Sequence, residues 1–116
     1  MGKLFNEQES SDATEAVAEL AKFFPGAVPV RIPVCVSQTN AASTGQAEQT
    51  VIEFGTAEEI LFVSSLPLDF DDTVRVCNAD GSLNTVAKII AMRLHHGRMV
   101  IAARFLEGVA NWIIKA

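Results

Sequence analysis

Positive charge is scarce in this chain of 116 residues. Nine lysines and arginines stand against fourteen aspartates and glutamates, so the formal net charge is −5 at pH 7. Binding to the phosphates of a nucleic acid needs a basic face. The composition therefore argues against DNA or RNA as a partner, although a few arginines would be enough to hold one small anionic ligand.

Cysteine is also rare, and it occurs only at Cys35 and Cys77. The two lie far apart in sequence, each within a β-like run, so we expect two small buried apolar side chains. A disulfide between them stays open, because nothing in the sequence indicates an oxidising compartment. His95 and His96 are adjacent, so their side chains diverge on a strand and do not readily share one metal. We expect no metal site and no cofactor.

Long apolar runs are missing as well. No window approaches the roughly 18 apolar residues that a membrane-spanning helix requires, and the segment from Met1 to Asn6 lacks the apolar stretch of a signal peptide. Met1-Gly2 begins like a myristoylation motif, but Asn6 stands where that motif has serine or threonine. We expect a soluble cytoplasmic protein without a membrane span.

The chain has the length of a single domain, and a large share of its residues is apolar. Apolar residues make up 49% of the sequence, which excludes disorder of the whole chain. A chain of this size buries roughly two-thirds of its unfolded surface, enough for one core. We expect an acidic N-terminal tail with an amphipathic helix over residues 1–26, followed by a β domain over 27–116.

Residues 7–24 have the apolar period of a helix. Asp12 and Glu15 form a capping-box pattern, and an apolar stripe repeats at helical spacing. The stripe consists of Val17, Leu20, Ala21 and Phe24. It either packs on the rest of the domain or presents a face to a partner, and Pro25-Gly26 ends the helix.

Six β-rich runs come after the helix, separated by turn residues. The first run contains Pro29 and Pro33, which suit the edge of a sheet because proline lacks an N–H donor. In the second run, Ile52 and Phe54 are predicted to share a face, since side chains alternate along a strand. The six runs are residues 29–36, 49–54, 60–65, 73–77, 83–94 and 99–105.

The last three runs, from Thr73 to Phe105, are typical of an antiparallel meander. Asp80-Gly81 is a strong hairpin turn signal, and residues 95–98 supply the second turn. In the last strand, one face is predicted to be core and the other to carry Arg104, and the core face consists of Met99, Ile101, Ala103 and Phe105. Six antiparallel strands with short turns favour a closed barrel, since closure removes the sheet edges.

The predicted fold is therefore mainly β. We expect a six-stranded antiparallel β-barrel with an N-terminal helix and a short C-terminal helix. The C-terminal helix covers residues 107–115, and Trp112 on its inner face closes one end of the barrel as a core residue.

The order of these runs and turns resembles a PilZ-type domain over about residues 28–110. The residues that carry the resemblance are Arg31-Ile32-Pro33-Val34, Ile60-Leu61-Phe62, Leu66-Pro67-Leu68, Asp72-Thr73-Val74-Arg75-Val76 and Val100-Ile101-Ala102-Ala103-Arg104-Phe105. The resemblance implies a six-stranded β-barrel that commonly binds the bacterial messenger cyclic di-GMP. In the family, an R-x-x-x-R motif clamps phosphates and stacks on guanine, and a D/N-x-S-x-x-G motif reads the guanine.

Both ligand motifs are incomplete in this chain. Arg31 fits the second arginine of the first motif, but Ala27 stands where the family has the first arginine. The second motif falls on Phe54, Thr56 and Glu59, of which only Thr56 keeps the chemistry, through its hydroxyl. Glu59 and the glutamate before it add negative charge where an anionic ligand would sit, which opposes binding.

The sequence therefore predicts a non-enzymatic regulatory or adaptor domain. It would act through a protein partner in bacterial signalling, with weak or no cyclic di-GMP binding. The alternative is a cyclic di-GMP receptor that uses Arg31 and Thr56, helped by Arg75, Arg98 or Arg104. The identity of the partner stays open, as does the choice between monomer and homodimer.

A small enzyme is a third hypothesis. Its candidate groups show no nucleophile with a base and an orienting group at interpretable spacing, so this hypothesis is the weakest. The groups are Cys35, Cys77, Asp69, Asp71, Asp72, His95 and His96.

Overall fold

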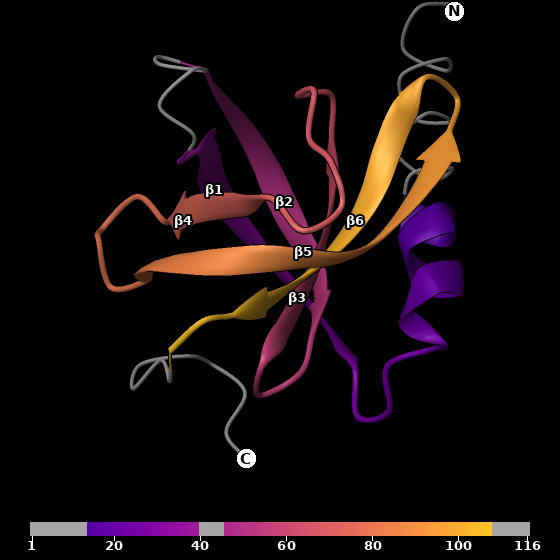
Figure 1. The fold of residues 1–116 in the computed structure, drawn as a ribbon. Helices are drawn as coiled ribbons and strands as arrows, with labels where there is room; N and C mark the ends of the chain where they lie inside the picture. The colour runs from indigo at the N-terminus through magenta and orange to yellow at the C-terminus, as the bar shows by residue number, and fades with distance from the viewer. Residues whose placement is uncertain (1–13, 40–45, 108–116) are drawn as a thin grey trace, which may run out of the picture.

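The computed structural model describes residues 14–39 and 46–107 of the chain (Figure 1). Its strands are β1 (Val28–Gln38), β2 (Ala47–Gly55), β3 (Glu59–Ser64), β4 (Thr73–Cys77), β5 (Asn84–His95) and β6 (Arg98–Phe105). One helix, residues 14–21, precedes them in the described part of the chain. Each strand coincides with one of the predicted runs to within a few residues.

The six strands form a closed barrel in the order β1-β2-β3-β6-β5-β4, and β4 pairs back onto β1. All neighbours are antiparallel, so the predicted closed barrel is confirmed, together with the meander of β4, β5 and β6. The closing ladder holds four residue pairs and begins at Cys35 opposite Cys77. Among the described strands, the first half of β1 therefore has β2 as its one neighbour, and this edge is where Pro29 and Pro33 stand.

Both predicted turns of the meander form. Between β5 and β6, His96 and Gly97 have φ angles of 50° and 79°, as a two-residue hairpin turn requires. Between β4 and β5, Gly81 has a φ of 77°, and the Asp80 carboxylate accepts hydrogen bonds from the backbone N–H and the hydroxyl of Ser82. The bond from the Ser82 N–H is the main reason that the pKa of Asp80 lies below its usual value.

The interior of the barrel is one apolar cluster to which all six strands contribute. Its buried members are Val34, Val36, Ile52, Ile60, Phe62, Leu68, Val74, Val76, Leu83, Ala87, Ile89, Ile101, Ala103 and Phe105. Phe62 is the largest of the fully buried side chains. Because side chains alternate along a strand, this interior also fixes which residues point outward.

A second buried cluster lies outside the barrel, where the helix packs on β3 and β6. Val17 and Leu20 of the helix join Leu61 of β3 with Val100 and Ala102 of β6. The prediction that one face alone of β6 is core is therefore wrong, since the helix buries the other face as well. The apolar stripe of the helix faces the barrel and not a partner. Figure 1 shows the helix alongside the β5–β6 hairpin.

A β-bulge breaks the predicted alternation in β2. The pairing of β2 with β3 shifts between Ile52, which faces Phe62, and Phe54, which faces Leu61. An extra residue in one strand turns the next side chains to the opposite face. Ile52 therefore lies inside the barrel, whereas Phe54 packs against the outer cluster under the helix, and the prediction that the two share a face is wrong.

The helix ends before the predicted stop. It runs to residue 21, a turn comes next, and Gly26 reverses the chain with a φ of 87°. The predicted cap at Asp12 lies outside the described residues, and so do residues 108–115 of the predicted C-terminal helix with Trp112. Within residues 14–39 and 46–107, no helix has both the length and the apolar character that crossing a membrane would require.

Candidate functional site

Arg31 lies at an irregular point near the start of β1. The β1–β2 register shifts between Pro29, opposite Phe54, and Ile32, opposite Ile52, so two residues of β1 face one of β2. Arg31 is exposed and has a φ of 54°. A left-handed conformation is uncommon for a residue other than glycine and costs on the order of 1 kcal/mol. The bulge thus holds the arginine at the surface in an unusual backbone geometry.

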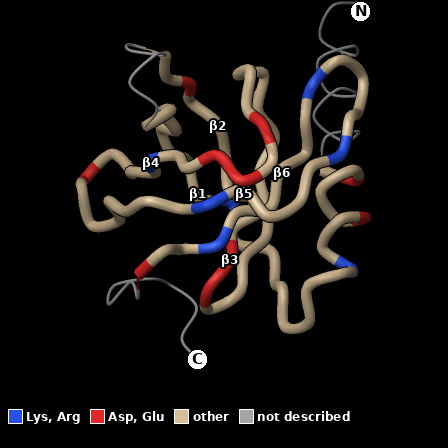
Figure 2. The backbone as a smooth tube through the Cα atoms, in the orientation of Figure 1, with Lys and Arg blue, Asp and Glu red and all other residues tan. Residues whose placement is uncertain are grey.

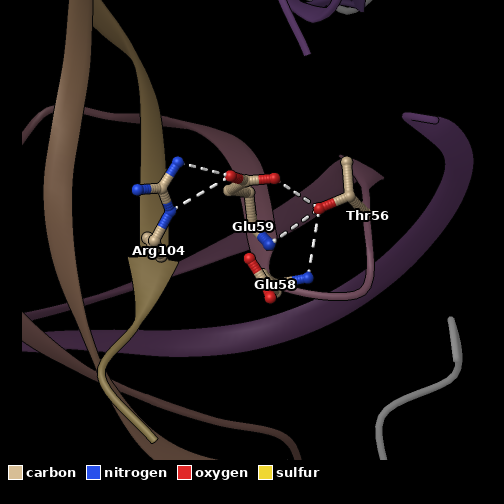
Figure 3. A network of polar contacts seen from close by, with 4 residues as sticks. All are labelled: Thr56, Glu58, Glu59 and Arg104. Carbon is tan, nitrogen blue, oxygen red and sulfur yellow. Dashed lines mark hydrogen bonds and ion pairs between the residues drawn. The ribbon is translucent and has the colours of Figure 1, made fainter. Parts of the chain in front are cut away.

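Thr56 lies in the tight turn that connects β2 to β3, and it is buried. Its hydroxyl oxygen accepts hydrogen bonds from the backbone N–H groups of Glu58, at 3.1 Å, and Glu59, at 2.9 Å. The same hydroxyl donates to Oε1 of Glu59 at 2.5 Å (Figure 3). Hydroxyls of serine and threonine stabilise turns in this way, so the Thr56 side chain is engaged in the structure of its own loop.

Glu59 joins this turn to β6. It stands directly opposite Arg104 in the β3–β6 register, and its Oε2 accepts hydrogen bonds from Nε of Arg104 at 3.1 Å and Nη2 at 2.7 Å. The Glu59 side chain is 13% exposed, against 53% for Arg104. The carboxylate is thus shared between a guanidinium and a hydroxyl, in the network of Figure 3. We call Thr56, Glu58, Glu59 and Arg104 the turn network.

The turn network changes the predicted electrostatics of the second motif. The sequence predicts that Glu58 and Glu59 add negative charge at this place. In the structure Arg104 offsets the charge of Glu59, while Glu58 stays exposed. Arg104 lies 45 positions from Glu59 in sequence. The pairing of β3 with β6 is the feature from which this partner could have been predicted.

The remaining motif positions do not assemble a cationic clamp. Phe54 packs under the helix, and Ala27 donates its N–H to the carbonyl of Phe24 at 3.0 Å. Val28 pairs with Gly55, so the start of β1 does lie beside the turn that holds Thr56. Arg31 is nevertheless exposed there, while Thr56 is buried.

Two of the arginines predicted to help Arg31, Arg75 and Arg98, lie elsewhere on the barrel. Arg75 stands opposite Ser37, six residues along β1 from Arg31, which is about 20 Å along a strand. Its Nη1 donates to Oδ1 of Asn84 at 3.0 Å. Arg98 begins β6 at the hairpin turn, opposite His95. Figure 2 shows the basic positions dispersed over several strands of the described chain.

Several groups considered for catalysis make contacts with neighbouring residues of the fold. Asp72 accepts a hydrogen bond from the backbone N–H of Asp69 at 2.9 Å, and Asp71 forms an ion pair with Lys88 at 3.0 Å. The rings of His95 and His96 meet edge to face, with centroids 4.2 Å apart. Among residues 14–39 and 46–107, no group of three or more His, Cys, Asp or Glu side chains is placed to hold a metal ion.

Both cysteines are partly exposed, so the prediction that they are buried is wrong. The reason is the strand alternation: Val34 and Val36 of β1 and Val76 of β4 point into the barrel, which turns Cys35 and Cys77 to the outside.

Glu48 forms a second polar cluster, near the start of β2. Its Oε1 accepts a hydrogen bond from the Ser64 hydroxyl at 2.6 Å, and its Oε2 one from the backbone N–H of Ser65 at 3.0 Å. Partial burial alone would raise the pKa of Glu48. The hydrogen bonds from Ser64 and Ser65, together with the positive charge of Arg98, outweigh this effect and lower the pKa. The ionised carboxylate therefore ties β2 to the end of β3.

Replacing Arg104 with methionine should destabilise the turn network. The Glu59 carboxylate would lose its charged partner while it stays largely buried, and we expect the free energy of unfolding to fall by about 1–2 kcal/mol. Urea denaturation of both proteins at pH 7 measures the change. Arg93→Met is the matched control, because Arg93 is exposed on β5, and we expect a change below about 0.5 kcal/mol. Equal losses in the two variants would contradict a role for the network.

Two comparisons with known proteins provide no relative on which to base a function. A scan of the chain against models of protein families finds no match, and a search of curated proteins finds none either. The functional proposal therefore rests on the sequence resemblance and on the geometry of the described residues.

Proposed function

We propose that this protein is a non-enzymatic, PilZ-like regulatory or adaptor domain that acts through protein–protein contacts in bacterial signalling, with weak or no cyclic di-GMP binding. The observation that carries the proposal is the turn network. Thr56 occupies the position of the one retained hydroxyl of the ligand motif, and it hydrogen-bonds to the backbone and side chain of its own turn. Glu59 occupies the position of the motif glycine and is bound to Arg104.

The charges at this place oppose an anionic ligand. Cyclic di-GMP carries two phosphates, and it would have to lie beside the exposed Glu58 or draw Arg104 away from Glu59. The first arrangement brings like charges together, and the second leaves a largely buried carboxylate without its partner. Arg31 alone offers one cation at the start of β1, where the family has two arginines.

Exposed apolar side chains give the barrel surfaces for protein contacts. Phe23 comes just after the helix, Phe70 lies between β3 and β4, and Leu94 lies near the end of β5. Their exposed fractions are 75%, 65% and 69%. Exposed side chains of this size are the kind that anchor protein interfaces when a partner covers them. The three lie on separate parts of the chain, so the proposal leaves open which of them the partner contacts.

The alternative function is a cyclic di-GMP receptor that relies on Arg31. One observation favours it: the arginine is exposed, at a bulge with a left-handed backbone, on the half of β1 that pairs with β2 alone among the described strands. Strained backbone is often found at binding sites. In this alternative the guanidinium clamps a phosphate, and ligand binding displaces part of the turn network.

Isothermal titration of the full chain with cyclic di-GMP separates the two functions. For the adaptor we expect no saturable heat, that is, a Kd weaker than about 100 μM. Saturable binding that is lost in Arg31→Ala and kept in Arg75→Ala would overturn the proposal in favour of the receptor. Arg75→Ala is the matched control, because it removes an exposed arginine from the neighbouring strand β4.

Crosslinking in bacterial cells tests for the protein partner. A photo-reactive amino acid is placed at Phe23, Phe70 or Leu94, with an exposed polar position, Glu15, as the control site. If the protein is an adaptor, we expect one strong adduct with a second protein, formed from an apolar site and not from Glu15. Adducts of equal yield from all four sites would contradict a specific interface.

A further inference from the structure

Two thiols that are distant in sequence lie opposite each other on the barrel. Cys35 of β1 and Cys77 of β4 are direct partners in the antiparallel register. Partners in such a ladder have side chains on the same face, here the outer one. The Cys77 thiol lies 3.9 Å from the backbone carbonyl oxygen of Cys35, although the residues are 42 positions apart. Both thiols are free.

The two thiols are open to small molecules. Both cysteines are partly exposed, and both line an open groove of about 370 Å³. Pro33 and Val51 contribute to one part of its wall, and Asn78 to another. A groove of this size and openness admits a reagent as small as hydrogen peroxide, so the thiols can react without unfolding of the barrel.

The spacing of the ladder suits a disulfide that is easily reduced. The backbone N–H of Thr39 donates to the carbonyl of Thr73 at 3.4 Å, so these two residues form a hydrogen-bonded pair in line with the β1–β4 ladder. Such pairs recur at every second residue of antiparallel strands. Cys35 and Cys77 are therefore a hydrogen-bonded pair as well. Their Cα atoms are then about 5.5 Å apart, inside the range of disulfides. Their Cβ atoms are somewhat farther apart than a disulfide prefers, so the bond strains the ladder and is more readily reduced.

We propose that Cys35 and Cys77 form a reversible oxidation site, at which a peroxide converts the two thiols into a cross-strand disulfide. One thiolate attacks an oxygen of hydrogen peroxide, the O–O bond breaks, and a sulfenic acid and one water form after proton uptake. The second thiolate attacks the sulfenic sulfur, and the S–OH bond breaks with release of a second water. In total, two protons and two electrons pass from the thiols to the peroxide, and a dithiol, itself oxidised to a disulfide, later restores both thiols.

A disulfide between Cys35 and Cys77 has a structural consequence because of where the two residues lie. The ladder between β1 and β4 closes the barrel with four residue pairs, and Cys35 opposite Cys77 is the outermost of them. A disulfide there joins the two strands covalently at the point where they diverge. A transient disulfide of this kind is compatible with a reducing compartment, and the inference does not depend on the proposed function.

Peroxide treatment of the full-length, reduced protein tests the proposal. After exposure to hydrogen peroxide, free thiols are alkylated and the intact mass is measured. We expect a monomer that is lighter by two hydrogens and takes up no alkyl group, with a Cys35–Cys77 crosslink in the peptide map. Dithiothreitol should restore two alkylation sites. The single variants Cys35→Ser and Cys77→Ser should not lose hydrogens in this way.

The matched control is the double variant Cys35→Ser/Ser37→Cys. It keeps two thiols on the outer faces of β1 and β4, but it moves one of them to a diagonal position, about 7–8 Å from its partner. We expect its intramolecular disulfide to form at least about tenfold more slowly than in the native chain. The proposal is overturned if the native protein keeps both alkylation sites after oxidation, or if the double variant crosslinks equally fast.

Discussion

Replacing Phe62 with alanine is expected to lower the free energy of unfolding by about 3–5 kcal/mol. Phe62 is fully buried at the centre of the barrel, and its strand β3 is paired on both sides, with Ile52 of β2 and Ile101 of β6 opposite it. The smaller side chain removes apolar contacts and leaves a cavity that strands fixed on both sides cannot fill. Since domains are typically stable by about 5–15 kcal/mol, the variant should be close to the limit of folding.

Urea denaturation followed by far-UV circular dichroism measures this loss. The dependence on urea should keep the slope of the native protein while the midpoint falls. Phe70→Ala is the matched control: the same side chain is removed from a position that is 65% exposed, and we expect a change below about 0.5 kcal/mol. A loss below about 1 kcal/mol for Phe62→Ala would contradict its place at the centre of the core.

Replacing Val17 with aspartate should release the helix from the barrel. Val17 is fully buried in the outer cluster with Leu61, Val100 and Ala102, where a carboxylate would have apolar neighbours. We expect a loss of about 3 kcal/mol, because a buried charge without a partner is strongly unfavourable. The loss is limited to the energy of helix docking, since the helix can move into water and leave the barrel closed.

Three measurements together test this second prediction. The helical part of the far-UV spectrum should fall while the β part stays, trypsin should cut after Lys22 faster, and a dye that binds apolar surface should fluoresce more strongly. Ala18→Asp serves as the control, because Ala18 is next to Val17 on the helix but lies outside the buried cluster. Its cost should stay below about 1 kcal/mol. Complete unfolding of Val17→Asp would show that the barrel needs the helix.

Local sequence patterns were sufficient to predict most of the fold. Strand alternation, Asp80-Gly81 and the turn at residues 95–98 predicted the meander, and the strand count predicted closure. Prediction failed at Phe54, because a single extra residue at a bulge reverses the face of the residues after it, and no composition signal marks that extra residue. It failed as well on the outer face of β6, where alternation says which side chains point outward but not that a helix covers them.

For the candidate site as well, one part could be predicted from the sequence and another part required the structure. The resemblance to a PilZ-type domain implied that Ala27 and Phe54 stand where a ligand motif has polar groups, and that Arg31 and Thr56 keep its chemistry. Only the tertiary structure showed that the Thr56 hydroxyl is engaged within its turn and that Glu59 has a cationic partner in Arg104.

By itself the sequence determined that this chain forms a six-stranded antiparallel barrel with a helix before it. The tertiary structure decided which residues meet across the barrel: Glu59 with Arg104, and Cys35 with Cys77. The physical reason is that alternation and turn chemistry act over a few residues. Pairings across 42 or 45 positions depend on the register of strands that meet only when the barrel closes.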